Sequence, residues 1–252
     1  MAAFETKDAA AIVTGHSRGI GESIAAALLE QGMRVLGVSR HGNAQLVRQH
    51  PGMLQEAAVD LGDMAALTQW IAADTLGRFI ADGKRALLVN NAGVIQPIGP
   101  LETQDPSLIG RAITVNVSAA FMLSAAFVQA TSALTDRRIL HVSSGAGRKP
   151  YAGWSIYCST KAAMDHHARC AALDHTQNLL IASVAPGVVD TEMQAEIRGS
   201  TNERFPDRPR FVQLHQDHAL PTPERIGRRL VNFLLCDVFG AEPVFDLRDF
   251  VA

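Results

Sequence analysis

Tyrosine and lysine are scarce in this chain of 252 residues, and one of each lies four positions apart. The pair is Tyr157 and Lys161, drawn from two tyrosines and four lysines. Residues four apart share one face of a helix, with Cβ atoms about 5–6 Å apart. A phenol with its usual pKa of about 10 exchanges protons poorly at neutral pH, and a nearby ammonium group lowers that pKa. The spacing therefore predicts a pair that gives a proton to a carbonyl oxygen or removes one from an alcohol.

Polar side chains also stand at the ends of two predicted buried strands. Ser143 and Ser144 end one strand, and residues 90–93 (Asn-Asn-Ala-Gly) end another. In open α/β sheets ligands bind at the carboxyl edge of the strands, so we expect these groups beside the Tyr–Lys pair. Asn116 lies within an otherwise apolar helical run, where a buried amide needs partners. It is either a satisfied core amide or a group that braces the helix backbone or holds a water molecule near Lys161.

A glycine-rich turn, residues 14–21 (TGHSRGIG), separates the first predicted strand from the first predicted helix. Its glycines are Gly15, Gly19 and Gly21. The missing side chains let the backbone approach a pyrophosphate closely, and the helix N-terminus that follows favours an anion. A plain turn would also tolerate glycine, but the position directly after the first strand favours a dinucleotide site.

The end of the second predicted strand bears on which dinucleotide would bind. An NAD site calls for an acidic residue about 20 residues further on, which accepts a hydrogen bond from the ribose 2′-hydroxyl. Here that place reads Ser39-Arg40-His41 and has no carboxylate. Guanidinium groups match the geometry of a phosphate, so Arg18 and Arg40 together predict NADP(H). The alternative for Arg40 is a merely solvated side chain.

Short β-branched runs alternate with helical patterns along the chain. Continuous apolar strands separated by helices indicate a parallel sheet covered on both faces. We therefore expect an α/β fold, a single Rossmann-like, doubly wound domain over residues 1–252 with about seven strands. Residues 190–222 are expected to form a substrate-binding loop or lid, because 199–222 is polar and weakly periodic. The predicted strands cover residues 10–14, 34–39, 54–59, 86–90, 139–143, 181–185 and 244–246.

Composition argues against several other classes of protein. The formal net charge is −2, and pairs such as Arg137-Arg138 are expected to be solvated helix ends, so nucleic acid is not expected as a partner. Three cysteines lack metal-ligand spacing, and no metal site is expected. The apolar run 113–134 carries Asn, Ser and Gln and is expected to be a buried helix, not a membrane span. Residues 1–10 lack the pattern of a signal peptide, so we expect a cytoplasmic protein.

Taken together, these motifs resemble those of the short-chain dehydrogenase/reductase family. TGHSRGIG matches the family's TGxxxGxG turn, NNAG its strand-four motif, YCSTK its YxxxK motif and PGVVDT its PGxVxT segment. The resemblance implies a homodimer or homotetramer formed through the helices at 105–134 and 157–176. It also implies that the cofactor is held by Gly15, Ser17, Arg18, Gly19, Ile20, Gly21, Arg40, Asp60, Leu61, Asn91, Ala92, Gly93, Tyr157, Lys161, Pro186, Gly187, Val189 and Thr191.

The resemblance assigns a catalytic role to Asn116, Ser144, Tyr157 and Lys161. Ser144 is preferred to Ser143 because it precedes Tyr157 by 13 residues, as the family's catalytic serine does. The implied reaction is hydride transfer from NADPH to a carbonyl carbon, with Tyr157 protonating the oxygen and Ser144 polarising it. Lys161 would lower the tyrosine pKa and hold the nicotinamide ribose, and Asn116 would support a proton relay to solvent.

The C-terminal part is similar to the sepiapterin reductase and benzil reductase branch of this family, which reduces pterin side-chain ketones or 1,2-diketones. The similarity lies in PGVVDTEMQAEIR and FGAEPVFDLRDF. In this branch an aspartate near the C-terminus anchors a pterin, and Asp246 is the candidate. Its order is Val-Phe-Asp instead of the expected Val-Asp-Phe, so a solvated edge-strand position is the alternative. The expected substrate contacts are Gln96, Tyr151, Trp154, Met193 and Asp246.

The sequence therefore indicates an NADPH-dependent carbonyl reductase that acts on a 1,2-dicarbonyl or a pterin side-chain ketone. A generic ketoreductase, for instance one that reduces 3-oxoacyl thioesters, is the alternative within enzymes. A catalytically silent NADP(H)-binding or sensor protein is a more remote alternative, because nothing in binding alone demands all four catalytic residues.

Overall fold

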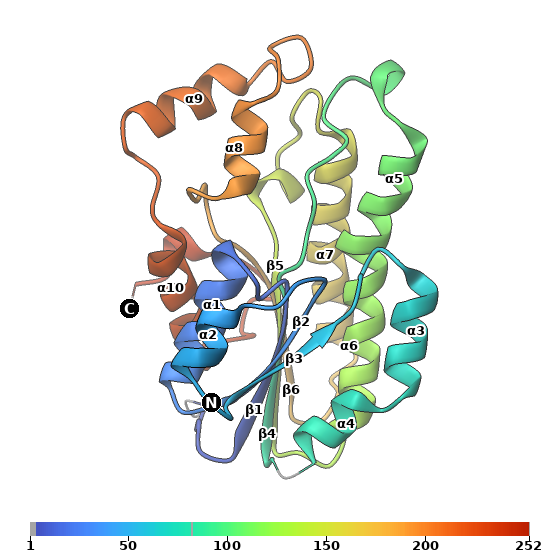
Figure 1. Ribbon diagram of the computed structural model, residues 1–252, viewed down its shortest axis with the longest axis vertical. Helices are drawn as coiled ribbons and strands as arrows, with labels where there is room; N and C mark the ends of the chain where they lie inside the picture. Colours follow the sequence, from blue (N-terminus) through green and yellow to red (C-terminus); the bar gives the residue numbers. More distant parts are fainter. Residues whose placement is uncertain (1–3, 82, 252) are drawn as a thin grey trace.

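The computed structural model describes residues 4–81 and 83–251, which fold around a seven-stranded sheet (Figure 1). The strand order is β3-β2-β1-β4-β5-β6-β7, and all neighbouring strands are parallel. This confirms the predicted Rossmann-like sheet; of the predicted domain 1–252, residues 1–3, 82 and 252 lie outside the described residues. The strands are β1 (Ala9–Thr14), β2 (Arg34–Ser39), β3 (Leu54–Ala58), β4 (Arg85–Asn90), β5 (Asp136–Val142), β6 (Leu179–Ala185) and β7 (Val244–Asp246).

Alternate residues of β1 pack into two different cores, which is why the strand reads as one apolar run. Ala9, Ala11 and Val13 face the first core, and Ala10 and Ile12 face the second. The first core is covered by α1 (Gly19–Glu30), α2 (Ala44–Gln49) and α10 (Pro223–Leu235). The second is covered by α3 (Met64–Ala72), α4 (Thr75–Ile80), α6 (Ala119–Ala130) and α7 (Ser155–Leu173).

The prediction that Arg137 and Arg138 end a helix in solvent was wrong. Both lie in β5, and both are buried. Arg138 donates to the carbonyl oxygens of Leu234 and Cys236 at 2.8 and 2.7 Å and pairs with Asp136 at 3.0 Å. A guanidinium group can lie in a buried strand when acceptors satisfy its N–H groups. Here the two carbonyl acceptors, Leu234 and Cys236, come from a distant part of the chain.

A long apolar helical run packs against the second face of the sheet. It consists of α5 (Pro106–Ile113), a π-helical turn (Thr114–Ser118) and α6. Among the described residues this run is the one helix long and apolar enough to cross a membrane by length and composition, and 44% of its most apolar window is buried. Its contacts with β4, β5, α4 and α7 agree with the interpretation of a helix packed inside the protein.

Two further helices lie over the carboxyl edge of the sheet, α8 (Glu192–Arg198) and α9 (Arg208–Gln216) (Figure 1). Thr191 begins α8 by accepting a hydrogen bond from the backbone N–H of Gln194. The segment 199–222, predicted as a weakly periodic loop, contains α9. Because Phe211 is the buried residue of α9, its helical pattern is weak in the sequence.

Candidate active site

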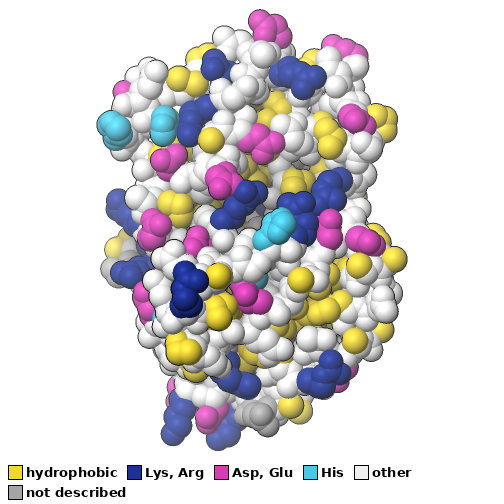
Figure 2. All heavy atoms as spheres, viewed as in Figure 1, with side chains coloured by type: hydrophobic (Ala, Val, Ile, Leu, Met, Phe, Trp, Pro, Cys, Tyr) yellow, Lys and Arg dark blue, Asp and Glu magenta, His cyan; other side chains and the backbone are white. Residues whose placement is uncertain are grey.

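A cleft of about 940 Å³ opens at the carboxyl edge of the sheet, bounded by the β1–α1 turn, the ends of β4 and β5, and α8. Basic and acidic side chains mix over the middle of this face (Figure 2). The volume lies at the upper end of the range for small-molecule sites, which suits a dinucleotide together with a substrate. Of the site residues predicted from sequence, Asn116 does not line this cleft and all the others do.

The β1–α1 turn has the backbone shape that a pyrophosphate requires. Gly15 and Gly19 adopt left-handed φ angles of 67° and 60°. A Cβ atom on Gly21 would collide with the carbonyl oxygen of Gly15, so the turn closes only with glycine there. No side chain caps the first N–H groups of α1, which leaves them available to an anion. These residues fit the phosphates of a dinucleotide.

The NNAG segment braces this turn from the neighbouring strand. Asn91 Nδ2 donates to the carbonyl oxygens of Thr14 and Gly15 at 3.0 and 3.3 Å. The hydroxyl of Thr14 accepts from the backbone N–H groups of Asn91 and Ala92, each at 3.0 Å. Thr14 is buried, and its role was not predicted, although it opens the quoted glycine-rich run. These hydrogen bonds join the glycine-rich turn and the NNAG segment into one floor of the cleft.

Two arginines line the end of the cleft beside β2. The guanidinium of Arg18 forms an ion pair across the cleft with Glu192 of α8, and both side chains are exposed. Arg40 lies near Asp60. Burial raises the pKa of Asp60. Hydrogen bonds from the backbone N–H of Gly62 and from Arg111, together with the charges of Arg111 and Arg40, outweigh burial and bring the pKa below its usual value. Both predicted arginines therefore line this end of the cleft, each with a carboxylate nearby.

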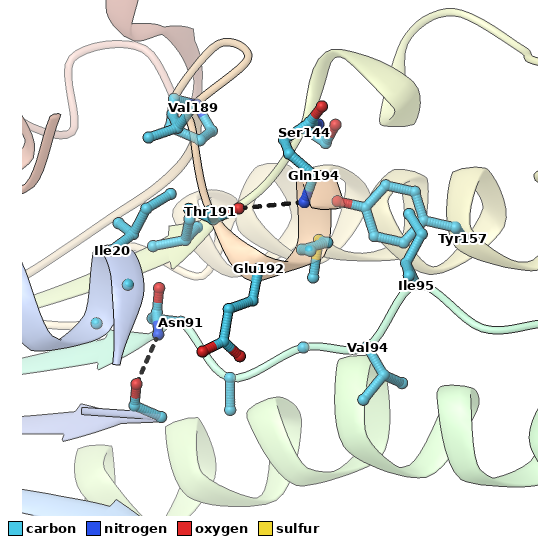
Figure 3. Close-up of a pocket in the computed structure, with 18 of the residues that line it drawn as sticks. Ile20, Asn91, Val94, Ile95, Ser144, Tyr157, Val189, Thr191, Glu192 and Gln194 are labelled. Atoms are coloured by element: carbon cyan, nitrogen blue, oxygen red, sulfur yellow. Dashed lines mark hydrogen bonds between the residues drawn. The ribbon is translucent and has the colours of Figure 1, made fainter. Parts of the chain in front are cut away.

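Tyr157 and Ser144 face the same part of the cleft from α7 and from the loop after β5 (Figure 3). Tyr157 is 7% exposed. Burial raises the pKa of Tyr157 to about 12, and a hydrogen bond with Ser144 opposes only part of that shift. The phenol is therefore protonated across the neutral range.

Lys161 lies beside Tyr157, but its ammonium group points toward β5. Nζ donates to the carbonyl oxygen of Val142 at 2.8 Å and lies 5.7 Å from the centroid of the Tyr157 ring. Burial lowers the pKa of Lys161 to about 8, and the charge of Asp165 opposes that shift. The expected lowering of the Tyr157 pKa by Lys161 is not found here, because burial sets the direction of the shift and only the hydrogen bond with Ser144 opposes it.

Asn116 braces the backbone of the cleft floor. Its Oδ1 accepts from the N–H of Val94 at 2.8 Å, and its Nδ2 donates to the carbonyl of Val94 at 2.9 Å and to Thr160 Oγ1 at 3.1 Å. The π-helical turn places the amide toward this segment, and such bulges are frequent at functional sites. The buried amide is thus satisfied by the segment after β4 and by Thr160 of α7, and not by the backbone of its own helix.

The structure separates the two adjacent serines. Ser143 is buried, and its hydroxyl donates to Asp165 at 2.7 Å in the interior. Ser144 lines the cleft, accepts a hydrogen bond from the N–H of Ala146 and contacts Tyr157. Ser143 also borders the cleft, but its hydroxyl is engaged by Asp165, so the hydroxyl of Ser144 is the better placed of the two to contact a substrate.

Aromatic rings enclose the other end of the cleft. Trp154 stacks on Phe205 with centroids 4.2 Å apart and packs near Tyr151 and Phe211 at 5.2 and 5.5 Å. Met193 packs against the same cluster. The sequence predicted Tyr151, Trp154 and Met193 but missed the two phenylalanines, since nothing in the polar segment around them marks a contact with Trp154.

Two predicted substrate residues already have partners within the protein. Gln96 donates to Glu196 of α8 at 2.7 Å and accepts from the N–H of Ile98 at 2.9 Å. Asp246 lines the cleft, but its carboxylate receives two side-chain hydrogen bonds from Arg248, at 2.9 and 2.7 Å. Those bonds lower the pKa of Asp246, and burial opposes them. Asp246 is thus at the site, in a pair with Arg248.

Comparison with known proteins agrees with these motifs. Residues 9–202 match the family model described as short chain dehydrogenase. The chain belongs to the short-chain dehydrogenase family. It is 33% identical over 236 residues to benzil reductase ((S)-benzoin forming) of Bacillus cereus, covering 90% of this chain and 94% of that protein. It is 30% identical over 256 residues to sepiapterin reductase of Meriones unguiculatus, covering 96% and 97%.

Solved structures of short-chain dehydrogenases share the fold. One from Burkholderia vietnamiensis is 46% identical with a TM-score of 0.71 and covers 98% of this chain and 100% of its own. A protein named as a candidate NAD(P)-dependent gluconate 5-dehydrogenase from Beutenbergia cavernae, with NADP bound at low occupancy, is 26% identical with a TM-score of 0.79, and the match covers 94% of each chain. As a member of this family the protein is an oxidoreductase with an NAD(P)-binding site.

Proposed function

We propose that the protein is an NADPH-dependent carbonyl reductase that acts on a 1,2-dicarbonyl or a pterin side-chain ketone. The observation that carries this proposal is the pairing of a protonated Tyr157 with Ser144 on the wall of a cleft that also has a phosphate-binding turn. The similarity to benzil and sepiapterin reductases over nine-tenths or more of the chain supports the substrate class.

Each catalytic side chain then has a task that suits its position. The hydroxyl of Tyr157 donates a proton to the carbonyl oxygen, and Ser144 orients and polarises that oxygen. Lys161, charged below a pH of about 8, stabilises the phenolate that remains and holds the nicotinamide ribose. Asn116 fixes the cleft floor through Val94 and supports the relay that returns a proton from solvent. Bound NADPH supplies the hydride for the carbonyl carbon.

A preference for NADPH over NADH follows from Arg18 and Arg40. Guanidinium groups bind a phosphate through charge-assisted hydrogen bonds, and no carboxylate ends β2. Replacing both with alanine should weaken NADPH binding at least about tenfold and NADH binding far less. Fluorescence titration with each cofactor measures this, and Arg225→Ala on α10 is the control, because it removes an exposed arginine that does not line the cleft. Equal losses for both cofactors would refute the preference.

The aromatic end of the cleft favours a flat carbonyl substrate. Tyr151, Trp154 and Phe211 line this end, and their rings suit an aryl or pterin ring. Because the Asp246 carboxylate is engaged by Arg248, a diketone that needs no acidic anchor fits better than a pterin.

A substrate screen tests the proposed reaction. Purified protein is given NADPH with benzil, sepiapterin, aliphatic 1,2-diketones or an acetoacetyl thioester, and NADPH consumption is followed. We expect the highest kcat/KM with an aryl 1,2-diketone. Preference for the thioester would favour the generic ketoreductase, and binding of NADPH without any turnover would favour a sensor.

The proposal also covers the setting of the enzyme. We propose a cytoplasmic homodimer or homotetramer whose partner is a small-molecule carbonyl compound, with no role for nucleic acid, a membrane or a metal ion. The near-neutral charge and the packed apolar helix at 106–130 support this setting.

A further inference from the structure

A buried carboxylate lies one helical turn beyond the proposed catalytic lysine. Asp165 is 2% exposed on α7, four residues after Lys161. Its Oδ1 accepts from the hydroxyls of Ser143 and Ser183, each at 2.7 Å, and its Oδ2 accepts from Arg148 Nε at 3.1 Å. Burying an ionised carboxylate is costly unless other donors replace water, and three donors do so here.

The partners of Asp165 stand at both ends of the loop that carries Ser144. Ser143 precedes this loop, and Arg148 follows its short 3-10 turn, Gly145–Gly147. A Cβ atom on Gly147 would lie 2.8 Å from the carbonyl carbon of Lys161, so the loop packs directly on α7. The carboxylate therefore fastens the serine loop to the helix that carries the catalytic tyrosine and lysine.

We propose that Asp165 is a positioning residue for catalysis, which holds both ends of the Ser144 loop against α7 and keeps an anion beside Lys161. The kinetic part of this inference rests on the proposed carbonyl reduction. The electrostatic part does not, because it concerns the protein alone.

The charged and titratable groups around Lys161 are few. Tyr157 and Asp165 flank it on α7, and His141 faces it from β5. Burial lowers the pKa of His141 to about 3, so His141 is neutral at neutral pH, and Tyr157 is protonated. Asp165 is thus the group that opposes the loss of the Lys161 proton.

The four lysines of the chain make a direct measurement practical. Side-chain NMR of protein labelled with ¹³C-lysine gives a titration for Lys161, assigned by comparison with Lys161→Arg. In Asp165→Asn the Lys161 pKa should fall by at least about half a unit, because the variant removes an anion. Ser183→Ala should leave the titration unchanged. An unchanged Lys161 titration in Asp165→Asn overturns the electrostatic part.

A second variant predicts a shift of opposite sign. Arg148→Gln removes a cation near Asp165 without changing α7, so the Lys161 pKa should rise. This variant also keeps the proposal testable if Asp165→Asn folds poorly. A Lys161 pKa that falls in Arg148→Gln would mean that general loosening, and not the charge of Asp165, governs the lysine.

The positioning part is tested by two matched serine variants. Ser143→Ala and Ser183→Ala each remove one hydroxyl that lies 2.7 Å from the same carboxylate oxygen, but only Ser143 adjoins the serine loop. With the best diketone, Ser143→Ala and Asp165→Asn should lower kcat about tenfold while KM for NADPH stays within about twofold. Ser183→Ala should keep kcat within about twofold. Equal losses in the two serine variants would reduce Asp165 to a structural role.

Failure of the proposed carbonyl reduction and failure of the proposed role of Asp165 would give different results. If wild-type protein reduces none of the carbonyl compounds, the proposed function fails, and the lysine titrations still decide whether Asp165 acts on Lys161. If wild-type protein is active but Asp165→Asn matches it in kcat and in the Lys161 pKa, the positioning role fails and the proposed function stands.

Discussion

At the scale of single residues, burial keeps the proposed proton donor, Tyr157, in its neutral, protonated form until the reaction takes its proton. Burial raises the pKa of Tyr157 to about 12, so the phenol does not ionise at neutral pH. Lys161 lies close enough to stabilise a phenolate at the moment when one forms. An interaction that is stronger in the transition state than in the ground state is the kind that raises kcat. Removal of the Tyr157 hydroxyl should therefore affect chemistry far more than binding.

Tyr157→Phe tests this role directly. The variant keeps the ring that packs near Trp154 but loses the proton, so kcat for diketone reduction should fall at least about 100-fold. NADPH affinity, measured by fluorescence titration, should stay within about threefold, because other residues hold the phosphates. The matched control is Tyr151→Phe, which removes the hydroxyl of the other tyrosine in the cleft. Near-full activity of Tyr157→Phe would exclude Tyr157 as the acid.

At the scale of elements, the segment that carries α8 and α9, which we propose as a substrate lid, is held through a few aromatic contacts. Phe205 is fully buried and stacks on Trp154, and Phe211 completes the cluster. Most of the remaining α9 residues are exposed. The contact between Phe205 and Trp154 therefore ties this segment to the start of α7, which makes Phe205 an informative site for substitution.

Phe205→Ala should loosen this lid. Truncating a buried phenylalanine costs about 3–5 kcal/mol of local packing. Because α8 and α9 border the substrate end of the cleft, KM for the diketone should rise more than KM for NADPH. Steady-state kinetics measure both, and limited proteolysis should cut near 199–207 sooner than in wild type. A loss confined to NADPH binding would contradict the assignment of this end to the substrate.

Elements differed in how well the sequence predicted them, for a physical reason. β2 occurs at the predicted bounds, 34–39, because its apolar pattern follows from the two cores that it meets. Motif spacing also located the cleft residues, since TGHSRGIG, NNAG and PGVVDT each follow a strand of the sheet and YCSTK lies near the start of α7. The contacts of Arg138, Phe205 and Asp165 were not predictable, because their partners lie far away in the sequence and no local pattern marks them.

At the scale of the whole molecule, a buried histidine ties stability to pH. His141 is fully buried, where Asn90 Nδ2 lies 3.2 Å from its Nδ1 and its Nε2 lies 3.1 Å from Nδ1 of His167. Burial lowers its pKa to about 3, well below the usual 6.5. A histidine kept neutral in the folded state contributes its full stability above pH 6.5, and that stability is lost as the pH falls toward 3, because the unfolded chain binds a proton that the folded chain does not.

His141→Gln should weaken this pH dependence. Between pH 7 and 5 the wild-type free energy of unfolding should fall by about 2 kcal/mol through His141 alone, and the variant should lack that share. Urea unfolding at several pH values measures how steeply the free energy of unfolding changes with pH in each protein. The comparison of slopes does not depend on the absolute stability of the variant. Parallel pH dependences in the two proteins would show that His141 takes up its proton in the folded state.

We expect the proposed association of whole molecules to use the helical run at 106–130. By length and composition this run is apolar enough to cross a membrane, 44% of its most apolar window is buried in the chain, and Leu108 and Ile113 remain exposed on it. Phe121 of α6 stacks on His167 of α7 at 4.1 Å, which joins the two helices into one surface. Ala125 is an exposed small residue on α6, where a helix of a second copy can approach closely.

Ala125→Arg should therefore convert the proposed dimer or tetramer into smaller species. A long charged side chain there would be desolvated against an apolar neighbour, and that cost exceeds what a helix contact returns. Sedimentation velocity measures the mass, with Gln45→Arg on α2 as a control that adds the same charge to an exposed site in the other helix layer. If the wild-type chain is a monomer at all concentrations, or if both variants keep the wild-type mass, association runs through another surface.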